Sequence, residues 1–392
     1  MKPGFDQEVE LLLLATQPVQ TVVDVDRIRT LLAADLKWDF LYQLARRHYL
    51  LPLLHQRLST VHEALPDEVR RKLRLAYQEN VARNLIFADE LIQLTRALID
   101  AGIDSIAYKG PVLAVLAYGD PALRRFVDLD VMVRRDDVLR AAEVLMSRGY
   151  DAAQEFTEEQ QALLLNSQHN LQFTKHRQRL LVELHWQVSS HLFAASVTAE
   201  ELWNNLETVE LNGAELKTFS IDDLLFSLCV HGSRHLWERL AWIADIAHLL
   251  SRRPKVNWQK LLLRARVTQS DRMFLLGVHL AVVLFAAPVP DRVQQKIARD
   301  IGLQKLGREI SRRLFDGPRH REATATQIFK YNFRVRTDWL SRFRYMLFTL
   351  LPTERDLKLI NLPARMGFAY YLIRPFRMFS KGQTKTSRGA DA

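Results

Sequence analysis

The sequence has little of what disulfide-rich secreted proteins and membrane proteins depend on. Its 392 residues contain one cysteine, Cys229, so a disulfide within the chain is excluded, and the apolar run around Cys229 predicts a buried thiol. The longest apolar stretch, residues 274–290, falls short of the roughly 20 residues that a membrane span needs. The polar residues 1–8 do not make a secretory signal. We therefore expect a cytoplasmic protein without an integral membrane span, in which residues 274–290 form a buried helix.

Glycine and proline are also scarce, with 14 and 13 residues, and the hydrophobic share of 48% is typical of a folded protein rather than a disordered one. Single cores stop growing at roughly 250 to 300 residues, so a chain of this length predicts more than one domain. The net charge of +10 indicates attraction to polyanions. Nucleotides, nucleic acid and an anionic membrane surface all fit this charge, which does not choose among them.

The spacing of apolar residues divides the chain into four regions. Residues 1–100 carry apolar positions at helical spacing and predict a helical N-terminal region. Residues 101–218 mix short strands with helices, and residues 219–378 return to helical spacing. Residues 379–392 are polar and basic, which predicts a disordered tail. The predicted class is α+β, with a small mixed β-sheet core between two helical regions.

The predicted core begins with a strand, a tight turn and a helix. Residues 103–108 are an apolar run of strand length, and Lys109-Gly110-Pro111 then suits a turn into a helix that ends near Tyr118. The elements expected after it are a strand around Asp128, a helix over residues 137–148, and two strands over residues 169–174 and 179–186.

The strand around Asp128 carries two carboxylates. Because side chains alternate along a strand, Asp128 and Asp130 are expected to project together, about 7 Å apart, while Val127 and Leu129 face the core. Glu183 is a charged residue in another apolar strand and supplies a third carboxylate. Carboxylates this close need a cation, and Mg²⁺ prefers such oxygen ligands. We predict Asp128, Asp130 and Glu183 as catalytic and metal-binding residues, holding two ions about 4 Å apart.

The turn before this strand has the composition of a phosphate site. Backbone N–H groups at a helix start bind phosphates, so Lys109 and Gly110 are predicted to bind the nucleotide, together with Arg124, whose guanidinium can clamp a phosphate. Capping of the strand by Lys109 and a surface role for Arg124 remain open alternatives. His231 and His235 lie four residues apart, but no metalloprotease pattern surrounds them and a structural role is favoured.

At these residues the sequence resembles a bacterial nucleotidyltransferase family of the DNA polymerase β superfamily. The matching elements are Tyr108-Lys109-Gly110, residues 118–124, Asp128-Leu129-Asp130, Gly149-Tyr150, residues 182–185, His231, His235 and residues 242–245. The resemblance spans about residues 85–300 and implies the nucleotidyltransferase fold. It also implies Asp128, Asp130 and Glu183 as Mg²⁺ ligands. One departure is Pro111, which supplies no N–H where the superfamily has Gly-Ser or Gly-Gly in the phosphate turn.

The resemblance implies an enzyme that moves a nucleoside monophosphate from an NTP, with Mg²⁺ as cofactor, to an acceptor. The sequence does not name the acceptor, which could be a sugar, a peptide, a protein or RNA. Two alternatives stay open at this point. One is a kinase that uses the same site to transfer the γ-phosphoryl group, and the other is a non-catalytic nucleotide- or RNA-binding module.

Overall fold

The computed structural model describes residues 6–19, 21–152, 165–166, 168–176, 179–190, 193, 199–316 and 323–351. The predicted disordered tail and the last part of the predicted second helical region lie outside the described residues. The four predicted domain ranges therefore stay a prediction.

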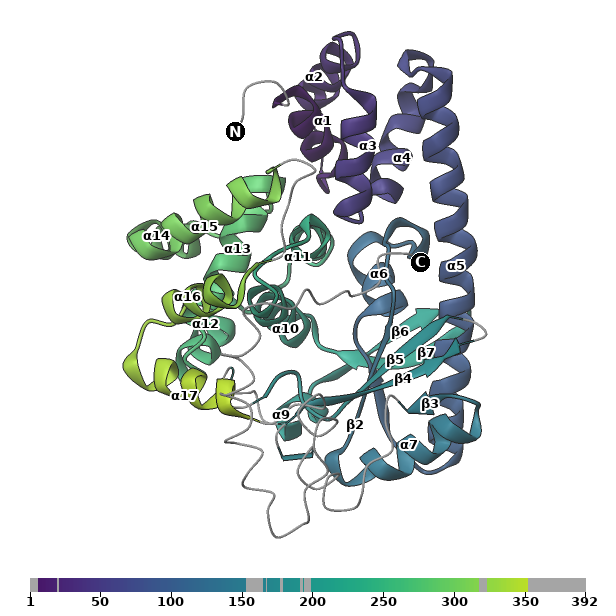
Figure 1. Ribbon diagram of the computed structural model, residues 1–392, viewed down its shortest axis with the longest axis vertical. Coiled ribbons are helices and arrows are strands. Elements are labelled where there is room, and N and C mark those ends of the chain that lie inside the picture. The colour runs from purple at the N-terminus through teal and green to yellow at the C-terminus, as the bar shows by residue number, and fades with distance from the viewer. Residues whose placement is uncertain are drawn as a thin grey trace.

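The N-terminal part of the chain is helical, as predicted. Its helices are α1 (Asp6–Thr16), α2 (Val22–Leu32), α3 (Trp38–Arg47), α4 (Leu51–Leu58), the 3₁₀ turn η1 (Ser59–Ala64) and α5 (Asp67–Asp100). Helix α5 has 34 residues, which corresponds to a length of about 50 Å. Its buried side chains, among them Phe87, Leu91, Leu94 and Leu98, recur at helical spacing on one face. Figure 1 shows α5 running along one side of the molecule, past both the small N-terminal helices and the sheet.

The core is a small mixed sheet, so the predicted α+β class is confirmed. The central elements are β1 (Ser105–Ala107), α6 (Gly110–Tyr118), η2 (Pro121–Leu123), β2 (Leu129–Val133), η3 (Arg135–Asp137), α7 (Val138–Ser147), β3 (Asp151–Ala152), β4 (Asn170–Lys175) and β5 (Leu180–His185). The strand order is β1-β2-β5-β4-β3. Strands β2 and β5 are parallel, and the other neighbours are antiparallel. Strand β2 is buried along its whole length, which is typical of a central strand covered on both faces.

Helices dominate the chain after the sheet. The elements there are α9 (Ala199–Trp203), β6 (Leu206–Leu211), β7 (Ala214–Phe219), α10 (Ile221–Arg234), α11 (Leu240–Arg252), α12 (Trp258–Val267), α13 (Asp271–Phe285), α14 (Asp291–Arg299), α15 (Ile301–Leu314), α16 (Ala325–Arg334) and α17 (Trp339–Leu350). Helix α13 packs against α10 and α11, and it confirms a buried helix in the stretch predicted over residues 274–290, although the helix ends at Phe285, where Ala286 turns to a left-handed conformation. Cys229 is buried as predicted. None of the described helices is long and apolar enough to cross a membrane.

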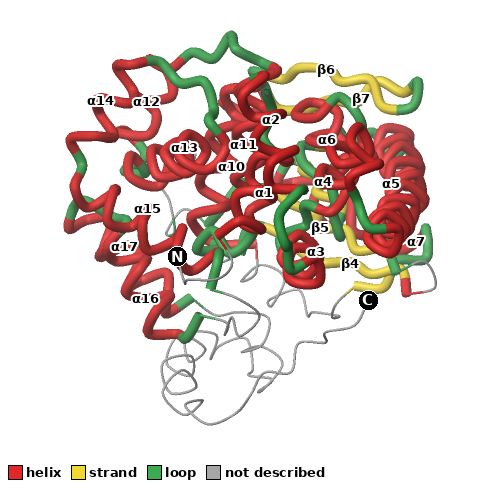
Figure 2. The backbone as a smooth tube through the Cα atoms, turned by 90° about the horizontal axis from the view of Figure 1, so that it is seen from above, coloured by secondary structure: helices red, strands yellow, loops and turns green. Residues whose placement is uncertain are grey.

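These later helices form the side of the molecule that faces away from α5. Figures 1 and 2 give two perpendicular views, and in both α13, α14 and α15 lie opposite α5, with α10 and α11 between them. Helices α10 and α11 therefore separate the outer helices from the core that contains the sheet.

The β6–β7 hairpin was not predicted, although the sequence carries its signal. Asn212 and Gly213 join the two strands with φ angles of 49° and 80°. A two-residue turn with both φ angles positive favours Asn-Gly. Strand β7 packs against β1, so the hairpin extends the wall beside the small sheet.

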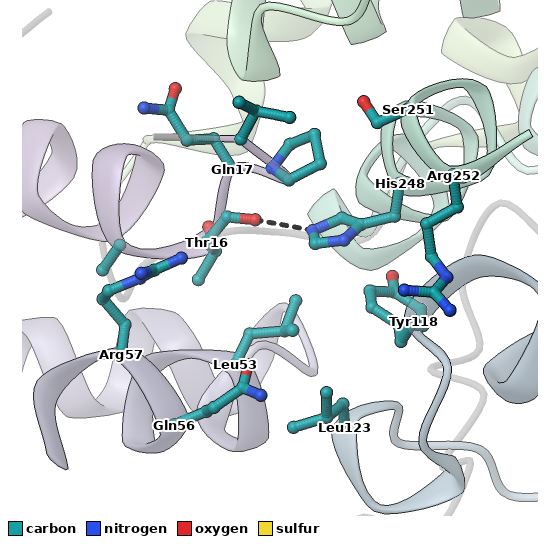
Figure 3. Close-up of a pocket in the computed structure, with 13 residues that line it drawn as sticks. Thr16, Gln17, Leu53, Gln56, Arg57, Tyr118, Leu123, His248, Ser251 and Arg252 are labelled. Carbon is teal, nitrogen blue, oxygen red and sulfur yellow. Dashed lines mark hydrogen bonds between the residues drawn. The ribbon is translucent and has the colours of Figure 1, made fainter. Parts of the chain in front are cut away.

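Helix α11 joins the N-terminal helices to the core. It packs on α6, and His248 Nε2–H donates a hydrogen bond of 2.9 Å to the carbonyl of Thr16 at the end of α1. Figure 3 shows this bond in a pocket between α1, α4 and α11, with Tyr118 of α6 beside the His248 ring. The ring centroids of Tyr118 and His248 are 4.4 Å apart. Both sides of α11 are therefore held by polar and aromatic contacts from other parts of the chain.

His248 makes stability depend on pH. Burial lowers its pKa from 6.5 to about 4, so the unfolded chain binds a proton there between these two values and the folded chain does not. The stabilising effect of the neutral ring is present above pH 6.5 and is lost as the pH falls toward 4. At 1.36 kcal/mol per pKa unit, the contribution of His248 to the free energy of unfolding is about 2 to 3 kcal/mol smaller at pH 4.5 than at pH 7.

We expect His248→Gln, which keeps an N–H donor for Thr16, to lose less stability than the wild type over this pH range. Urea unfolding at pH 7 and pH 4.5 measures the difference. His176→Gln is the control, because the side chain of His176 is 78% exposed. Equal pH dependence in the wild type and in His248→Gln would contradict the prediction.

Candidate active site

Two asparagines of α5 fix the path of the chain as it enters strand β2. Asn80 Nδ2 donates to the carbonyl of Ala122 at 2.8 Å, and Asn84 Nδ2 donates to the carbonyl of Arg124 at 2.8 Å. Asp120 shapes the turn just before, as the backbone N–H of Ala122 donates to its carboxylate at 2.8 Å. Both asparagines are almost fully buried. The segment that carries Asp128 is thus positioned by the long helix.

The turn at Lys109 and Gly110 brings the start of α6 against the same segment. Gly110 has a φ of +53°, and a Cβ atom there would lie 3.3 Å from the carbonyl oxygen of Asp128. Glycine is therefore required both by the backbone conformation and by the close approach. Pro111 lies at the start of α6, where its missing N–H costs no helical hydrogen bond, as predicted.

Strands β2 and β5 bring two carboxylates side by side. Their parallel register pairs Asp130 with Glu183, so both side chains project from the same face of the sheet. The Nε2 atom of His185 lies 3.1 Å from Asp130 Oδ1 and 3.3 Å from Glu183 Oε2. From β4, Gln172 Nε2 donates to Glu183 Oε1 at 2.8 Å. Within the described part of the chain, Asp130, Glu183 and His185 form the group that could hold a metal ion, with ligand atoms within 4.8 Å of one another.

Lys109 is the nearest cation to these carboxylates. Its Nζ donates to Asp130 Oδ1 at 2.7 Å, and only 11% of its side chain is exposed. Burial would lower the pKa of Lys109, but Asp130 and Glu183 outweigh burial and raise it. Burial would likewise raise the pKa of Asp130, whereas Lys109 and His185 hold it well below its usual range. Asp130 is therefore ionised, and Lys109 is charged.

His185 contacts the carboxylates of both central strands, Asp130 of β2 and Glu183 of β5. Burial would lower its pKa, but the hydrogen bonds to Asp130 and Glu183 outweigh burial and raise it. The pKa of Glu183 is lowered, because the His185 hydrogen bond overcomes the cost of burial. His185 lies two residues after Glu183 in β5, so both side chains project from the same face. The structure shows that His185 bridges the two carboxylates.

Asp128 lies beside this group, and its surroundings disfavour ionisation of its carboxyl. Burial, followed by repulsion from Asp130 and Glu183, raises its pKa to about 7. The chain joins strand β2 only at Leu129, one residue after Asp128. For this reason the prediction that Val127 faces the core is wrong: Val127 is 40% exposed.

Arg124 is engaged in a buried ion pair. Its Nε and Nη2 donate to the two carboxylate oxygens of Asp245 at 2.9 and 3.0 Å, and Tyr118 Oη donates to the same carboxylate at 2.8 Å. Burial would lower the pKa of Arg124, but Asp245 outweighs burial and raises it. The pair connects α11 to the segment before β2. Binding of a nucleotide by Arg124 stays a prediction.

A cleft of about 300 Å³ opens in front of these groups, and its lining includes Lys109, Arg124, Asp128, Asp130, Glu183 and Asp245. From α10 and the loop after it, His231 and His235 line the opposite wall, with ring centroids 4.6 Å apart. Both rings pack against Trp242, at 5.4 and 5.5 Å. The two histidines thus contact aromatic side chains, in keeping with the structural role favoured from the sequence.

Two further residues near the cleft gave no signal in the sequence. Arg234 of α10 donates to Nε2 of His169, whose ring lies 6.0 Å from that of His185. Burial, followed by the charge of Arg234, lowers the pKa of His169 well below its usual value, so the ring is neutral. These residues come from separate elements, which is why spacing along the chain could not reveal them.

Comparisons with known proteins identify a family for this chain. The family model described as "Uncharacterised nucleotidyltransferase" matches residues 34–286. No curated protein matches the chain. Among solved structures, the chain is similar to an antigenic nucleotidyltransferase-like protein from Paracoccidioides brasiliensis, with 16% identity over 51% of this chain and 96% of that one and a TM-score of 0.30. A TM-score this low supports no argument, so the family assignment depends on the match to residues 34–286.

Proposed function

This chain belongs to the family described as uncharacterised nucleotidyltransferases, as the sequence resemblance predicted, and from that premise we propose an Mg²⁺-dependent transfer of a nucleoside monophosphate. The donor is an NTP. The acceptor supplies a hydroxyl or phosphate oxygen. Asp128, Asp130 and Glu183 are the proposed catalytic and metal-binding residues.

The observation that carries this proposal is the grouping of three carboxylates in one cleft of a chain from this family. Asp128, Asp130 and Glu183 converge there, and the repulsion among them contributes to raising the pKa of Asp128 to about 7. Carboxylate oxygens grouped in this way are the ligands that a hard divalent cation such as Mg²⁺ prefers. When bound, Mg²⁺ would stabilise the charge that develops on the phosphate oxygens and make the attacking oxygen more nucleophilic.

The residues of the chain then have distinct roles in the proposal. The acceptor oxygen attacks the α-phosphorus of the NTP, a new P–O bond forms, and the bond to the bridging oxygen breaks, so pyrophosphate leaves with the electron pair. The proton of a hydroxyl acceptor passes to water. Lys109, at the start of α6, places a positive charge beside Asp130 and can donate hydrogen bonds to the phosphates of the NTP. Gly110 allows the close turn that presents the N-terminus of α6 to them. Glu183, held ionised by His185, is suited to metal binding rather than to accepting a proton.

Incubation with α-labelled and γ-labelled NTPs tests the type of transfer. We expect label from the α-phosphate on the acceptor and label from the γ-phosphate in pyrophosphate, only with Mg²⁺ present. Label from the γ-phosphate on the acceptor, with label from the α-phosphate left in the nucleoside diphosphate, would identify a kinase. Binding of NTP by calorimetry with no labelled product, in the presence of total cell RNA, protein and small-molecule extracts as acceptors, would instead identify a non-catalytic module.

A further inference from the structure

A second cavity of about 580 Å³ adjoins the candidate active site. It lies between α3, α4, α5 and the N-terminal end of α11, in the region of Figure 1 where the N-terminal helices meet the core. Four residues line both this cavity and the catalytic cleft, namely Tyr49, Arg125, Val127 and Arg239. We call the second cavity the arginine basin. Because these four residues line both cavities, the basin and the cleft are adjacent, and a molecule bound in the basin can extend into the cleft.

The lining of the basin is mostly cationic, whereas the lining of the cleft holds acidic and basic side chains in similar numbers. Its lining contains four arginines, Arg46, Arg47, Arg125 and Arg239, and one acidic residue, Glu79. Burial, followed by the nearby Arg239, lowers the pKa of Arg47. Like charges gathered in a partly buried cavity repel one another unless an anion lies between them. The basin therefore favours a ligand that carries more than one negative charge.

Two of the four arginines, Arg125 and Arg239, are held in place before any ligand binds. The guanidinium of Arg239 lies 4.6 Å from the centre of the Tyr49 ring, and that of Arg125 lies 5.6 Å from it. Arg239 also donates to the carbonyl of Arg47. Tyr49 has a φ of 62° because it ends helix α3: its N–H and that of Leu50 donate to the carbonyls of Arg46 and Ala45 in a Schellman motif, which fixes the backbone that carries the ring. Such an arrangement lowers the cost of ordering these side chains on binding.

The phosphates of the NTP have other partners, because Lys109 and the three carboxylates that would hold Mg²⁺ line the cleft rather than the basin. The basin combines guanidinium groups with the half-buried ring of Tyr42, which is the composition of sites for single-stranded nucleic acid. We propose that the arginine basin binds the phosphate backbone of a single-stranded nucleic-acid end, and that this end is the acceptor. The acceptor assignment rests on the proposed transfer, whereas the binding site does not.

Binding of a fluorescent single-stranded RNA octamer, followed by anisotropy without Mg²⁺ or NTP, tests the proposal. We expect the full-length Arg46→Gln/Arg47→Gln variant to bind roughly tenfold more weakly for each arginine lost. The slope of log affinity against log salt concentration should fall by about 1.4, since each phosphate contact contributes about 0.7 for single strands. Arg46→Glu, on an exposed side chain at the surface of α3, should weaken binding without affecting folding.

The matched control removes the same charge at the other end of α11. Arg253 and Lys255 are exposed there, about 20 Å from the basin along the 13-residue helix. Arg253→Gln/Lys255→Gln should bind RNA as the wild type does. An equal loss in this control, or unchanged binding in both basin variants, would overturn the proposal. So would equally tight binding of an octaglutamate peptide, because the site would then recognise acidic protein.

Three results separate this inference from the proposed transfer. The basin variants should keep the rise in melting temperature that Mg²⁺ and NTP give the wild type. Loss of that rise would place the NTP in the basin and overturn the inference. If RNA binds through the basin but no α-label reaches it, the acceptor assignment is wrong. Asp130→Asn should abolish transfer while leaving RNA binding intact, so a failure of the catalytic assignment is visible without any change at the basin.

Discussion

The Asp130→Asn variant is expected to lose Mg²⁺-dependent transfer by at least a factor of about a thousand. The metal contributes several kcal/mol of charge stabilisation to such reactions, and each 1.36 kcal/mol is about tenfold in rate. The carboxylate of Asp130 accepts hydrogen bonds from Lys109 and His185, and Asp130 pairs with Glu183 across strands β2 and β5. The rate of α-label transfer at saturating Mg²⁺ measures the effect. Asp136→Asn is the control, because Asp136 is exposed just beyond the other end of β2.

A variant can lose transfer because it fails to fold, and the stability of an Asp128→Asn variant excludes that explanation. The pKa of Asp128 is raised to about 7 by burial and by Asp130 and Glu183, so the ionised carboxylate destabilises the metal-free protein above that pH. Asp128→Asn removes this charge, and its free energy of unfolding at pH 8 without metal should equal or exceed that of the wild type. A variant that is as stable as the wild type yet inactive assigns Asp128 to catalysis. Full activity in the Asp128→Asn/Asp130→Asn double variant would refute the catalytic assignment.

The strands that carry the acidic group could be predicted because their signals are local. Residues 179–186 alternate in the way that β5 requires, and Glu183 stands out as a charge among apolar side chains. The turn at Gly110 was visible from the Gly-Pro pair before an apolar helix. Each of these features depends on residues close together in the chain. The family resemblance added their order, which no single motif establishes.

The partners of these residues could not be predicted, since they come from distant segments. Lys109 was expected to meet phosphate, and in the structure it pairs with Asp130, 21 residues away. Asp245 lies 121 residues from Arg124, and only packing of α11 on α6 brings them together. The arginine basin likewise joins α3 to the N-terminal end of α11. Composition gave a net charge of +10 but not the surface on which it is concentrated.

Removal of the buried carboxylate of Asp245 should have the largest effect on stability. The Asp245→Ala variant leaves the guanidinium of Arg124 buried without its partner and Tyr118 without an acceptor, and breaking such a pair from one side costs about 3 to 5 kcal/mol. Urea unfolding at pH 7 measures this cost. Glu309→Ala is the matched control, because Glu309 accepts two hydrogen bonds from Arg334 at 2.7 and 2.9 Å on the surface. With both partners about half exposed, this pair should be worth no more than about 1 kcal/mol.

The double variant Arg124→Met/Asp245→Leu separates the two roles considered for Arg124. With both charges gone and similar volume retained, it should recover most of the stability lost in Asp245→Ala, because no buried charge is left unpaired. An Asp245→Ala variant as stable as the wild type would show that the pair does not hold α11 to the core. The kinetics of transfer by the double variant then test whether Arg124 also binds the nucleotide. A folded double variant with an unchanged KM for NTP makes Arg124 a structural residue, whereas a KM raised tenfold or more with a preserved fold would assign its guanidinium to the nucleotide as well.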